Sequence, residues 1–324
     1  MAVAFLVFCI VLVGGATRLA DAGLSITEWQ PVFGIVPPLS DADWSAAFEM
    51  YKQIPEFKLQ NSAMTLEEFK VIFWWEWAHR LLGRLVGVVF ALPFVLFLIA
   101  GKIERRHVPR LLLLLLLGAA QGALGWYMVA SGLTERVDVS QYRLAAHLTL
   151  ASVIFAFTAW TIFCLGSRHR TPSSAGDLMA ILLLVLVFAQ IAMGGFVAGI
   201  DAGMGYNTWP KMDGQWIPNG LDAMQPAWRN LFENALTVQF VHRGLAYVLA
   251  ILVLVHAWNA FSLSGFVLAY GVWLQAAIGV LTLVLHVPLA LALTHQAAAM
   301  LVLLAAVWHL HRRLAMPLPA LDPQ

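Results

Sequence analysis

Eight apolar segments, each about as long as a membrane-spanning helix, constrain the fold of this 324-residue chain. The segments cover residues 2–18, 72–100, 110–130, 144–166, 177–199, 236–259, 264–286 and 291–311. Hydrophobic residues make up 61% of the chain and charged residues 11%, with a mean hydropathy of +0.79, which excludes an ordinary soluble domain. The sequence therefore predicts an all-α integral membrane protein with eight transmembrane helices.

Basic residues mark one side of the membrane. They gather in the short connections and at the end of the last segment: Lys102, Arg105, Arg106, Arg110, Arg168, Arg170, Arg312 and Arg313. By the positive-inside rule this side is the cytoplasm, and both termini lie there if the segments alternate. The expected location is the plasma (inner) membrane, with the long connections 19–71 and 200–235 on the periplasmic side. The first segment lacks a basic leader and ends at Arg18, which favours a span over a removed signal peptide.

The first long connection is predicted to contain one or two short surface helices. The sequences SDAD at 40–43 and TLEE at 65–68 each place a hydroxyl residue three positions before an acid. That spacing is typical of a helix N-cap, in which the two side chains bind each other's backbone N–H groups.

The chain also repeats itself. Seven residues recur 180 positions later: Gly14, Gly15, Asp21, Ala22, Gly23, Trp29 and Pro38 reappear as Gly194, Gly195, Asp201, Ala202, Gly203, Trp209 and Pro218. Further along, the offset falls to 163, 154 and 148: His79 and Arg80 recur as His242 and Arg243, Gln121 and Gly125 as Gln275 and Gly279, and His147 as His295. The number of positions between equivalent residues changes only where a connection lies, because the connections of the first copy are longer. This pattern indicates that the chain consists of two four-span copies. We expect domains at 1–170 and 171–324, arranged as parallel-repeat four-helix bundles.

Each copy carries two histidines at matching positions, His79 and His147 in the first and His242 and His295 in the second. All four are predicted in the first turns of even-numbered spans, which enter from the same side, so they should share one depth in the outer leaflet. Histidine is costly inside a bilayer and usually serves a function. The alternative is that these side chains only form hydrogen bonds between helices.

Two imidazoles on facing helices of a bundle suit the iron of a haem. Imidazole also binds copper and zinc, but no cysteine or clustered carboxylate completes a tetrahedral zinc site. Glycines on the neighbouring spans would leave room for a macrocycle. Arg80 and Arg243, which directly follow a histidine in each copy, are candidate contacts for haem propionates.

One position separates the two copies, since Glu76 in the first is Gln239 in the second. Glu76 precedes His79 by three residues, so both side chains project from nearly the same face of a helix. A carboxyl group beside a buried haem could take up a proton or stabilise positive charge. The alternative is an interfacial acid paired with an arginine. Because a purely structural role would be expected in both copies, the difference favours Glu76 as a catalytic residue.

The sequence resembles the haem A synthase family in its proteobacterial and mitochondrial form. The motifs that carry the likeness are VGGATRL at 13–19, GLSITEW at 23–29, MTLEEFK at 64–70, FWWEWAHR at 73–80, NTWPKM at 207–212 and VHR at 241–243. The resemblance covers nearly the whole chain, and the duplicated layout agrees with it.

This resemblance implies an oxidoreductase that converts its substrate haem O into haem A by oxidising a ring methyl to a formyl group. His242 and His295 would be the axial ligands of a haem b cofactor. His79 and His147 would face the iron of the substrate haem, with Glu76 as the important acid. Two oxidations of the methyl and loss of water would give the aldehyde, with electrons leaving through the haem b. This chain lacks the loop cysteine pair of some members, so no thiol step is carried over.

The resemblance also implies partners: haem O synthase, terminal oxidase assembly factors and membrane lipid, with a homo-oligomer allowed. The sequence does not indicate the electron acceptor, and the net charge of +1 gives no support to a nucleic-acid partner. Two other functions stay open. A dihaem cytochrome b that takes electrons from quinol predicts two permanent haems and no special acid. A transporter predicts broken helices and polar residues near the midplane, whereas the polar markers here gather in the outer leaflet.

Overall fold

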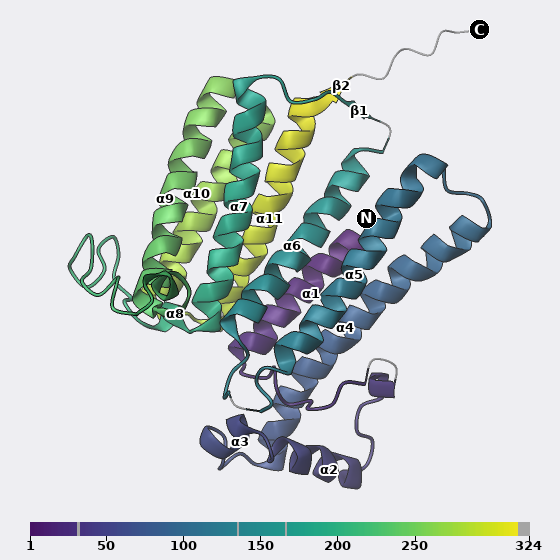
Figure 1. The fold of residues 1–324 in the computed structure, drawn as a ribbon, viewed down its shortest axis with the longest axis vertical. Helices are drawn as coiled ribbons and strands as arrows, with labels where there is room; N and C mark the ends of the chain where they lie inside the picture. Colours follow the sequence, from purple (N-terminus) through teal and green to yellow (C-terminus); the bar gives the residue numbers. More distant parts are fainter. Residues whose placement is uncertain (31–32, 135, 166, 317–324) are drawn as a thin grey trace. The chain divides into compact units, whose positions relative to one another are not determined.

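Eight long helices form the membrane part of the computed structural model, which describes residues 1–30, 33–134, 136–165 and 167–316 (Figure 1). Their bounds are α1 Ala2–Leu19, α4 Leu66–Ile99, α5 Val108–Val129, α6 Gln141–Phe163, α7 Ala175–Gly199, α9 Ala235–Ala260, α10 Leu263–Val284 and α11 Leu289–Leu314. All eight are long and apolar enough to cross a bilayer. The predicted all-α, eight-span fold is confirmed, and the chain is a multi-pass membrane protein.

Short elements connect these helices: η1 Phe33–Ile35, α2 Asp41–Tyr51, α3 Pro55–Leu59, η2 Arg105–His107, β1 Arg168–His169, η3 Ala202–Met204, η4 Ala227–Arg229, α8 Asn230–Glu233 and β2 Ala315–Met316, with β1 and β2 paired antiparallel. The surface helices predicted in the first connection are present as α2 and α3. Ser40 caps α2 in a capping box with Asp43, and Thr65 caps α4 in a capping box with Glu68. Both predicted N-caps are therefore confirmed.

Helix α4 begins at Leu66, six residues before the predicted start of its span at 72. The capping box starts this helix in polar sequence, which a hydropathy pattern does not detect. His79 consequently lies 13 residues after the start of its helix, so the prediction that it sits in the first turns is wrong. The other three histidines lie six or seven residues after the starts of α6, α9 and α11. The predicted end of the fourth span at 166 lies outside the described residues.

The chain divides into two compact units, an N-terminal unit of residues 2–154 and a C-terminal unit from Phe155 onward. In the C-terminal unit α7 packs on α9, α9 on α10, α10 on α11 and α11 on α7, which closes a ring of four helices (Figure 1). In the N-terminal unit α4 packs against α1 and α5. The domain boundary between residues 170 and 171 and the parallel-repeat arrangement stay predictions.

The two units bury their helices to different degrees. Helix α10 buries six residues: Ser264, Gly265, Leu268, Ala269, Val272 and Thr282. Helix α5, which holds the equivalent place in the first repeat, buries only Leu114. Helix α5 in the N-terminal unit is therefore less covered by protein than helix α10 in the C-terminal unit.

An aromatic subdomain, formed by α2, α3 and the start of α4, packs around its own core. Phe69 lies at its centre, with ring centroids 5.0 Å from Phe48 and 5.2 Å from Tyr51. Ala22 from the connection after α1 and Val139 from the connection before α6 are buried in the same core. Burial of these rings thus fixes two connections that lead into histidine-bearing parts of the N-terminal unit.

Glu56 is a carboxylic acid buried in the aromatic subdomain. It is 3% exposed, and its Oε2 atom has no hydrogen-bond partner. The Tyr51 hydroxyl hydrogen bonds to this carboxyl group, and Asn61 donates to the hydroxyl at 2.8 Å. Burial, reinforced by the charge of Asp138, raises the pKa of Glu56 to about 8. The folded protein therefore holds this carboxyl group in its neutral form at neutral pH.

We expect Glu56 to make the aromatic subdomain less stable at alkaline pH. Its folded-state pKa of about 8 lies above the ordinary value of 4.5, so the unfolded chain loses the proton first. The resulting loss of folding free energy is absent below pH 4.5, grows until about pH 8 and then stays constant, at a magnitude on the order of 5 kcal/mol. Glu56→Gln should remove it, so that the variant matches the unmutated protein in acid and exceeds it at alkaline pH.

Protease resistance of α2 and α3 in detergent, measured at about pH 4.5 and about pH 9, checks this expectation. Glu49→Gln is the matched control, because the Glu49 side chain in α2 is 65% exposed. An equal gain from both variants, or no gain from Glu56→Gln at alkaline pH, would contradict it.

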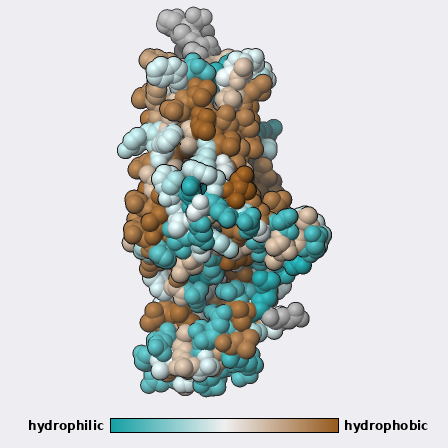
Figure 2. All heavy atoms as spheres, turned by 90° about the vertical axis from the view of Figure 1, so that its left-hand side faces the viewer, coloured by the Kyte–Doolittle hydropathy of each residue, from teal (hydrophilic) through white to brown (hydrophobic). Residues whose placement is uncertain are grey.

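Hydrophobic side chains cover the helical part of the face drawn in Figure 2, and hydrophilic residues gather over the connections. Large apolar residues are exposed on helices of both units, among them Leu92, Phe97, Ile251 and Trp258. Monomeric soluble proteins rarely expose contiguous apolar surface of this kind. Such a surface is what lipid tails cover.

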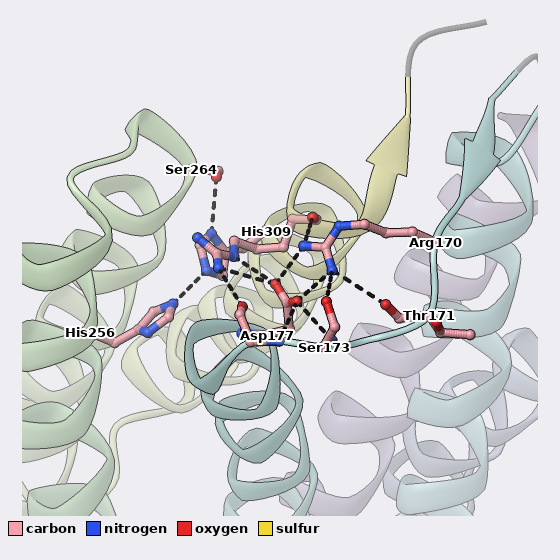
Figure 3. Close-up of polar contacts among 9 residues, drawn as sticks. Arg170, Thr171, Ser173, Asp177, His256, Ser264 and His309 are labelled. Atoms are coloured by element: carbon pink, nitrogen blue, oxygen red, sulfur yellow. Dashed lines mark hydrogen bonds and ion pairs between the residues drawn. The ribbon is translucent and has the colours of Figure 1, made fainter.

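A buried polar cluster fastens the C-terminal unit where α7 begins and α11 ends (Figure 3). The Asp177 carboxylate, which is 0% exposed, contacts Arg170 at 2.6 Å and Arg313 at 3.1 Å. Asp177 also completes the capping box of Ser174 at the start of α7. One carboxylate thus joins the connection before α7 to the last turn of α11.

Two further histidines, His256 and His309, meet in the same part of the C-terminal unit (Figure 3). Their Nε2 atoms are 2.8 Å apart, and Ser264 Oγ lies 3.0 Å from His309 Nδ1. In the sequence both are only residues near span ends. One Nε2 must donate and the other accept, so the pair carries at most one proton on these two atoms. The hydrogen bonds link α9, α10 and α11.

Candidate functional site

The two histidines of each repeat lie in the same structural unit. His79 on α4 and His147 on α6 belong to the N-terminal unit, and His242 on α9 and His295 on α11 belong to the C-terminal unit. Within each unit the two rings are close enough to interact electrostatically. Each unit therefore contains one pair of neighbouring imidazoles contributed by two different helices.

A glycine on a neighbouring helix faces every one of these rings. A Cβ atom added to that glycine would come close to the ring Cε1 atom: 2.8 Å for Gly14 and His79, 3.0 Å for Gly125 and His147, 3.5 Å for Gly194 and His242, and 2.7 Å for Gly279 and His295. At Gly14 and Gly279 the added carbon would overlap the ring, so a larger residue there would displace the imidazole. The glycines fix how closely the helices approach the histidines.

Three of the four rings also contact a glutamine that precedes the glycine by four residues. Gln121, Gln190 and Gln275 each donate through Nε2 to the backbone carbonyl of the facing histidine, at 3.1, 3.1 and 2.9 Å. The same Nε2 atoms lie 3.2, 3.2 and 3.4 Å from a ring nitrogen. The Oε1 atoms of all three are buried and have no hydrogen-bond partner. Each amide therefore holds both the backbone and the ring of its histidine.

The fourth position breaks this pattern. Ile10 precedes Gly14 by four residues, where the second repeat has Gln190 before Gly194. Among the residues that the structure describes, no side chain forms a hydrogen bond with His79, whose Nδ1 atom is buried without a partner. Its ring meets only the backbone carbonyl of Ile10. His79 thus lacks the glutamine contact that the other three imidazoles have, and its unpartnered Nδ1 atom is matched by that of His295.

These glutamines were not among the predicted site residues. In the sequence, Gln121 and Gln275 stand out only as markers of the repeat. The signal that identifies all three is the spacing Gln-x-x-x-Gly on α5, α7 and α10.

The Glu76 carboxylate is buried and surrounded by donors, with 3% of the residue exposed. Its Oε2 atom accepts hydrogen bonds from Ser25 Oγ at 2.7 Å and the Ile26 backbone N–H at 2.8 Å. Its Oε1 atom accepts from Arg80 Nε at 3.0 Å and Nη2 at 2.6 Å. These bonds tie the connection after α1 to α4, directly before His79.

Gln239 holds the same place in the second repeat, but its hydrogen bonds to the connection have the opposite direction. Its Nε2 atom donates to the carbonyls of Ala202 at 2.6 Å and Gly205 at 2.8 Å, and its Oε1 atom accepts from Arg243 at 2.8 Å. Glu76 and Gln239 thus both anchor the connection after the first helix of their repeat. The expectation that a structural role would show up as the same residue in both copies is therefore wrong, because the loops offer donors in one copy and acceptors in the other.

The arginines after His79 and His242 anchor the same two connections. Each guanidinium donates to two backbone carbonyls at 2.6–2.9 Å: Ile26 and Glu28 for Arg80, Tyr206 and Thr208 for Arg243. The acceptors are 180 residues apart, as the repeat requires. Arg243 Nε is buried without a partner, whereas Arg80 Nε binds Glu76. Contacts of these arginines with propionates stay a prediction.

The histidine sites fit an iron porphyrin better than a bare metal ion. Within the described ranges, no three His, Cys, Asp or Glu side chains are grouped as they would be around a metal ion. Two imidazoles from different helices are a donor set for haem iron in a helix bundle. The Nδ1 atoms of His79 and His295 are buried without a hydrogen-bond partner, an arrangement that a bound metal would satisfy.

Known proteins match almost the whole chain. The family COX15-CtaA, described as "Cytochrome oxidase assembly protein", matches residues 1–307. A protein named "Heme A synthase" from Parvibaculum lavamentivorans is 51% identical over 315 residues, which cover 96% of this chain and 92% of that protein. Proteins of the same name from Chelativorans sp. and Sinorhizobium medicae are 54% and 50% identical, cover 93% and 95% of this chain, and are each covered to 86%. The chain belongs to the COX15-CtaA family of cytochrome oxidase assembly proteins.

Proposed function

We propose that this protein is a haem A synthase, a membrane oxidoreductase that converts haem O into haem A by oxidising a ring methyl group to a formyl group. Relatives of that name, 50–54% identical over more than 90% of the chain, support the assignment. The product would serve terminal oxidases, in line with the description of the family. The observation that carries the division of roles is the Glu76 carboxylate in the first histidine site, where the second site has the amide of Gln239.

In this proposal His242 and His295 hold a haem b as the cofactor, which supplies one-electron redox chemistry when bound. Both imidazoles contact a glutamine, Gln190 or Gln275, and the four surrounding helices pack in a closed ring. A site in which both ligands are held suits a group that stays in place.

His79 and His147 then face the substrate haem O in the N-terminal unit. Helix α5 has Leu114 as its only buried residue, and a less enclosed bundle suits a site that a substrate must enter and a product must leave. Glu76 lies three residues before His79 on the same helix face, where its carboxylate can take up protons released as the methyl group is oxidised. Arg80 keeps that carboxylate in position.

The proposal places both termini in the cytoplasm and both haem sites toward the periplasmic side. The basic residues of the short connections, Arg105 and Arg106 among them, support this orientation. Haem O synthase and terminal oxidase assembly factors are the proposed partners, because one would supply the substrate and the others would receive the product.

Pigment extraction tests the proposed activity. Cells that lack their own haem A synthase, supplied with a haem O synthase and this chain, should contain haem A when extracted haems are separated by chromatography. Cells without the chain should contain haem O alone. Haem O without haem A, under conditions in which a relative named as a haem A synthase forms haem A, would overturn the proposal.

A dihaem cytochrome b that takes electrons from quinol is the second candidate. The matching glycines and arginines of the two sites favour it, since two equal sites suit two permanent haems. Purification from cells that make no haem O separates the candidates. A cytochrome would retain two haem b groups per chain, whereas the proposed enzyme would retain one.

A further inference from the structure

The two helices that carry the proposed haem b ligands each carry a second histidine 14 residues further along. His256 follows His242 on α9, and His309 follows His295 on α11. Fourteen residues make nearly four helical turns, or about 21 Å, so the second histidine of each helix projects from nearly the same face as the first. The pair of His256 and His309 is therefore in line with the pair that would bind the iron.

The hydrogen bond between His256 and His309 joins opposite helices of the C-terminal ring, because α9 packs on α7 and α10, and α11 packs on the same two helices. The two Nε2 atoms are 2.8 Å apart (Figure 3), and the residues are 5% and 0% exposed. Ser264 Oγ on α10 lies 3.0 Å from His309 Nδ1 and orients that ring. The contact thus sets the separation of the same two helices that a bis-histidine iron has to bridge.

The first repeat has no such pair of histidines. The offsets of 163 and 148 that relate the haem-site histidines make Pro93 on α4 equivalent to His256 and Thr161 on α6 equivalent to His309. Proline has no side-chain donor or acceptor, and the Thr161 hydroxyl donates to the carbonyl of Phe157 in its own helix at 2.8 Å. The histidine pair therefore belongs to the unit of the proposed cofactor and not to that of the proposed substrate.

The protonation of the pair decides whether this hydrogen bond exists. One Nε2 atom has to carry a proton and the other must not, so a proton on both atoms replaces the bond by repulsion. Arg313 interacts electrostatically with both rings, and α10 contains no acidic or basic residue. Asp177 on α7 is already paired with Arg170 at 2.6 Å and with Arg313 at 3.1 Å. None of these groups offsets a second positive charge on the pair.

We infer that His256 and His309 form a clamp that holds α9 and α11 at the separation that the haem b ligands need, and that protonation of both rings in acid breaks it. This inference rests on the proposed function, because it takes His242 and His295 as the ligands of haem b. The clamp residues are positioning residues, which act on the haem site through the two helices from about 21 Å away. The clamp preforms the cofactor site, whereas the site that admits and releases a substrate haem lacks one.

Two substitutions of His256 test the clamp. His256→Leu removes the hydrogen bond, so the purified protein should lose haem b about tenfold faster at neutral pH. His256→Gln supplies an amide that can bind His309 Nε2, so haem b should stay bound as in the unmutated protein. Transfer of haem b to excess apomyoglobin, followed by absorption spectroscopy, measures the loss. Thr161→Val is the matched control at the equivalent position of the first repeat and should change nothing.

The pH profile separates a clamp from a contact that only fills space. In acid the glutamine oxygen of His256→Gln still accepts a hydrogen bond from a protonated His309, whereas two protonated histidines repel each other. At about pH 4.5 the unmutated protein should therefore lose haem b about tenfold faster than His256→Gln. Protonation of His242 and His295 also releases haem in acid, but equally in both proteins. Identical pH profiles would overturn the inference, as would unchanged retention by His256→Leu at neutral pH.

The separation of the two helices can also be measured without haem. Spin labels at Trp258→Cys on α9 and Arg312→Cys on α11, both exposed positions, report it by double electron–electron resonance once Cys9 and Cys164 are replaced by alanine. The distance should lengthen in acid, and it should stay constant when His256→Gln is added. A distance that does not respond to acid would overturn the inference even in a protein that binds haem b. The expected distances in a protein that binds no haem b would overturn the proposed function and leave the clamp standing.

Discussion

The Glu76→Ala variant should form at least about 100-fold less haem A than the unmutated protein, while the spectrum of the haem b at His242 and His295 persists. The substitution removes the one carboxylate that accompanies the proposed substrate site, and that carboxylate lies on the helix that carries His79. Haem A per milligram of membrane protein, measured in cells supplied with haem O, checks the activity. The reduced-minus-oxidised spectrum of the same membranes checks the haem b.

The Glu76→Ala variant also loses the hydrogen bonds that hold the connection after α1. A control must therefore separate this structural effect from a direct role of the carboxylate in the reaction. Glu76→Gln keeps the size of the side chain and removes its charge, and it should be as inactive as Glu76→Ala. Gln239→Ala removes the corresponding anchor in the second repeat and should lose far less activity. If Glu76→Ala and Gln239→Ala lost equal amounts of haem A formation, Glu76 would serve only to hold the connection after α1 in place. Continued haem A formation in Glu76→Ala would remove its proposed role altogether.

The sequence was sufficient to predict the membrane helices because each is encoded locally. A run of apolar residues long enough to cross a bilayer has few alternatives to a helix, so all eight spans were predicted near their observed positions. The start of α4 was missed because its first turns are polar and depend on a capping box, Thr65 with Glu68, rather than on hydropathy. Helix packing within each unit was not predictable, since it depends on contacts between distant segments.

The sequence predicted the histidines, the arginines and the acid of the candidate site but not the contacts that they make. The repeat identifies equivalent residues, and so it singled out His79, His242 and their partners. It does not show what each residue contacts. The sequence shows Gln239 only as the position without the acid, yet its amide donates to loop carbonyls where the Glu76 carboxylate accepts from loop donors. The hydrogen bond between His256 and His309 was not predictable from the sequence either, because the two residues lie 53 positions apart and meet only through the packing of their helices.

The Gly279→Ala variant should bind haem b about tenfold more weakly than the unmutated protein, because it displaces the His295 ring. The added Cβ atom would lie 2.7 Å from Cε1 of that ring, inside the closest approach of two carbon atoms. Overpacking of this kind typically costs about 1–3 kcal/mol, and about 1.4 kcal/mol corresponds to a factor of ten in affinity. Haem b retained per chain after dilution of the purified protein in detergent measures the effect.

Gly194→Ala is the matched control within the same haem site. Its added Cβ atom would lie 3.5 Å from Cε1 of His242, an ordinary contact, so haem b should stay bound as in the unmutated protein. Equal retention by Gly279→Ala and Gly194→Ala would contradict the expected crowding. The backbone of His295 has little freedom to move away from the added Cβ atom, because Gln275 donates a hydrogen bond to its carbonyl at 2.9 Å. The backbone therefore stays in place and the imidazole turns instead, which moves the ring nitrogen that would bind the iron. One added methyl group should for this reason weaken the binding of haem b.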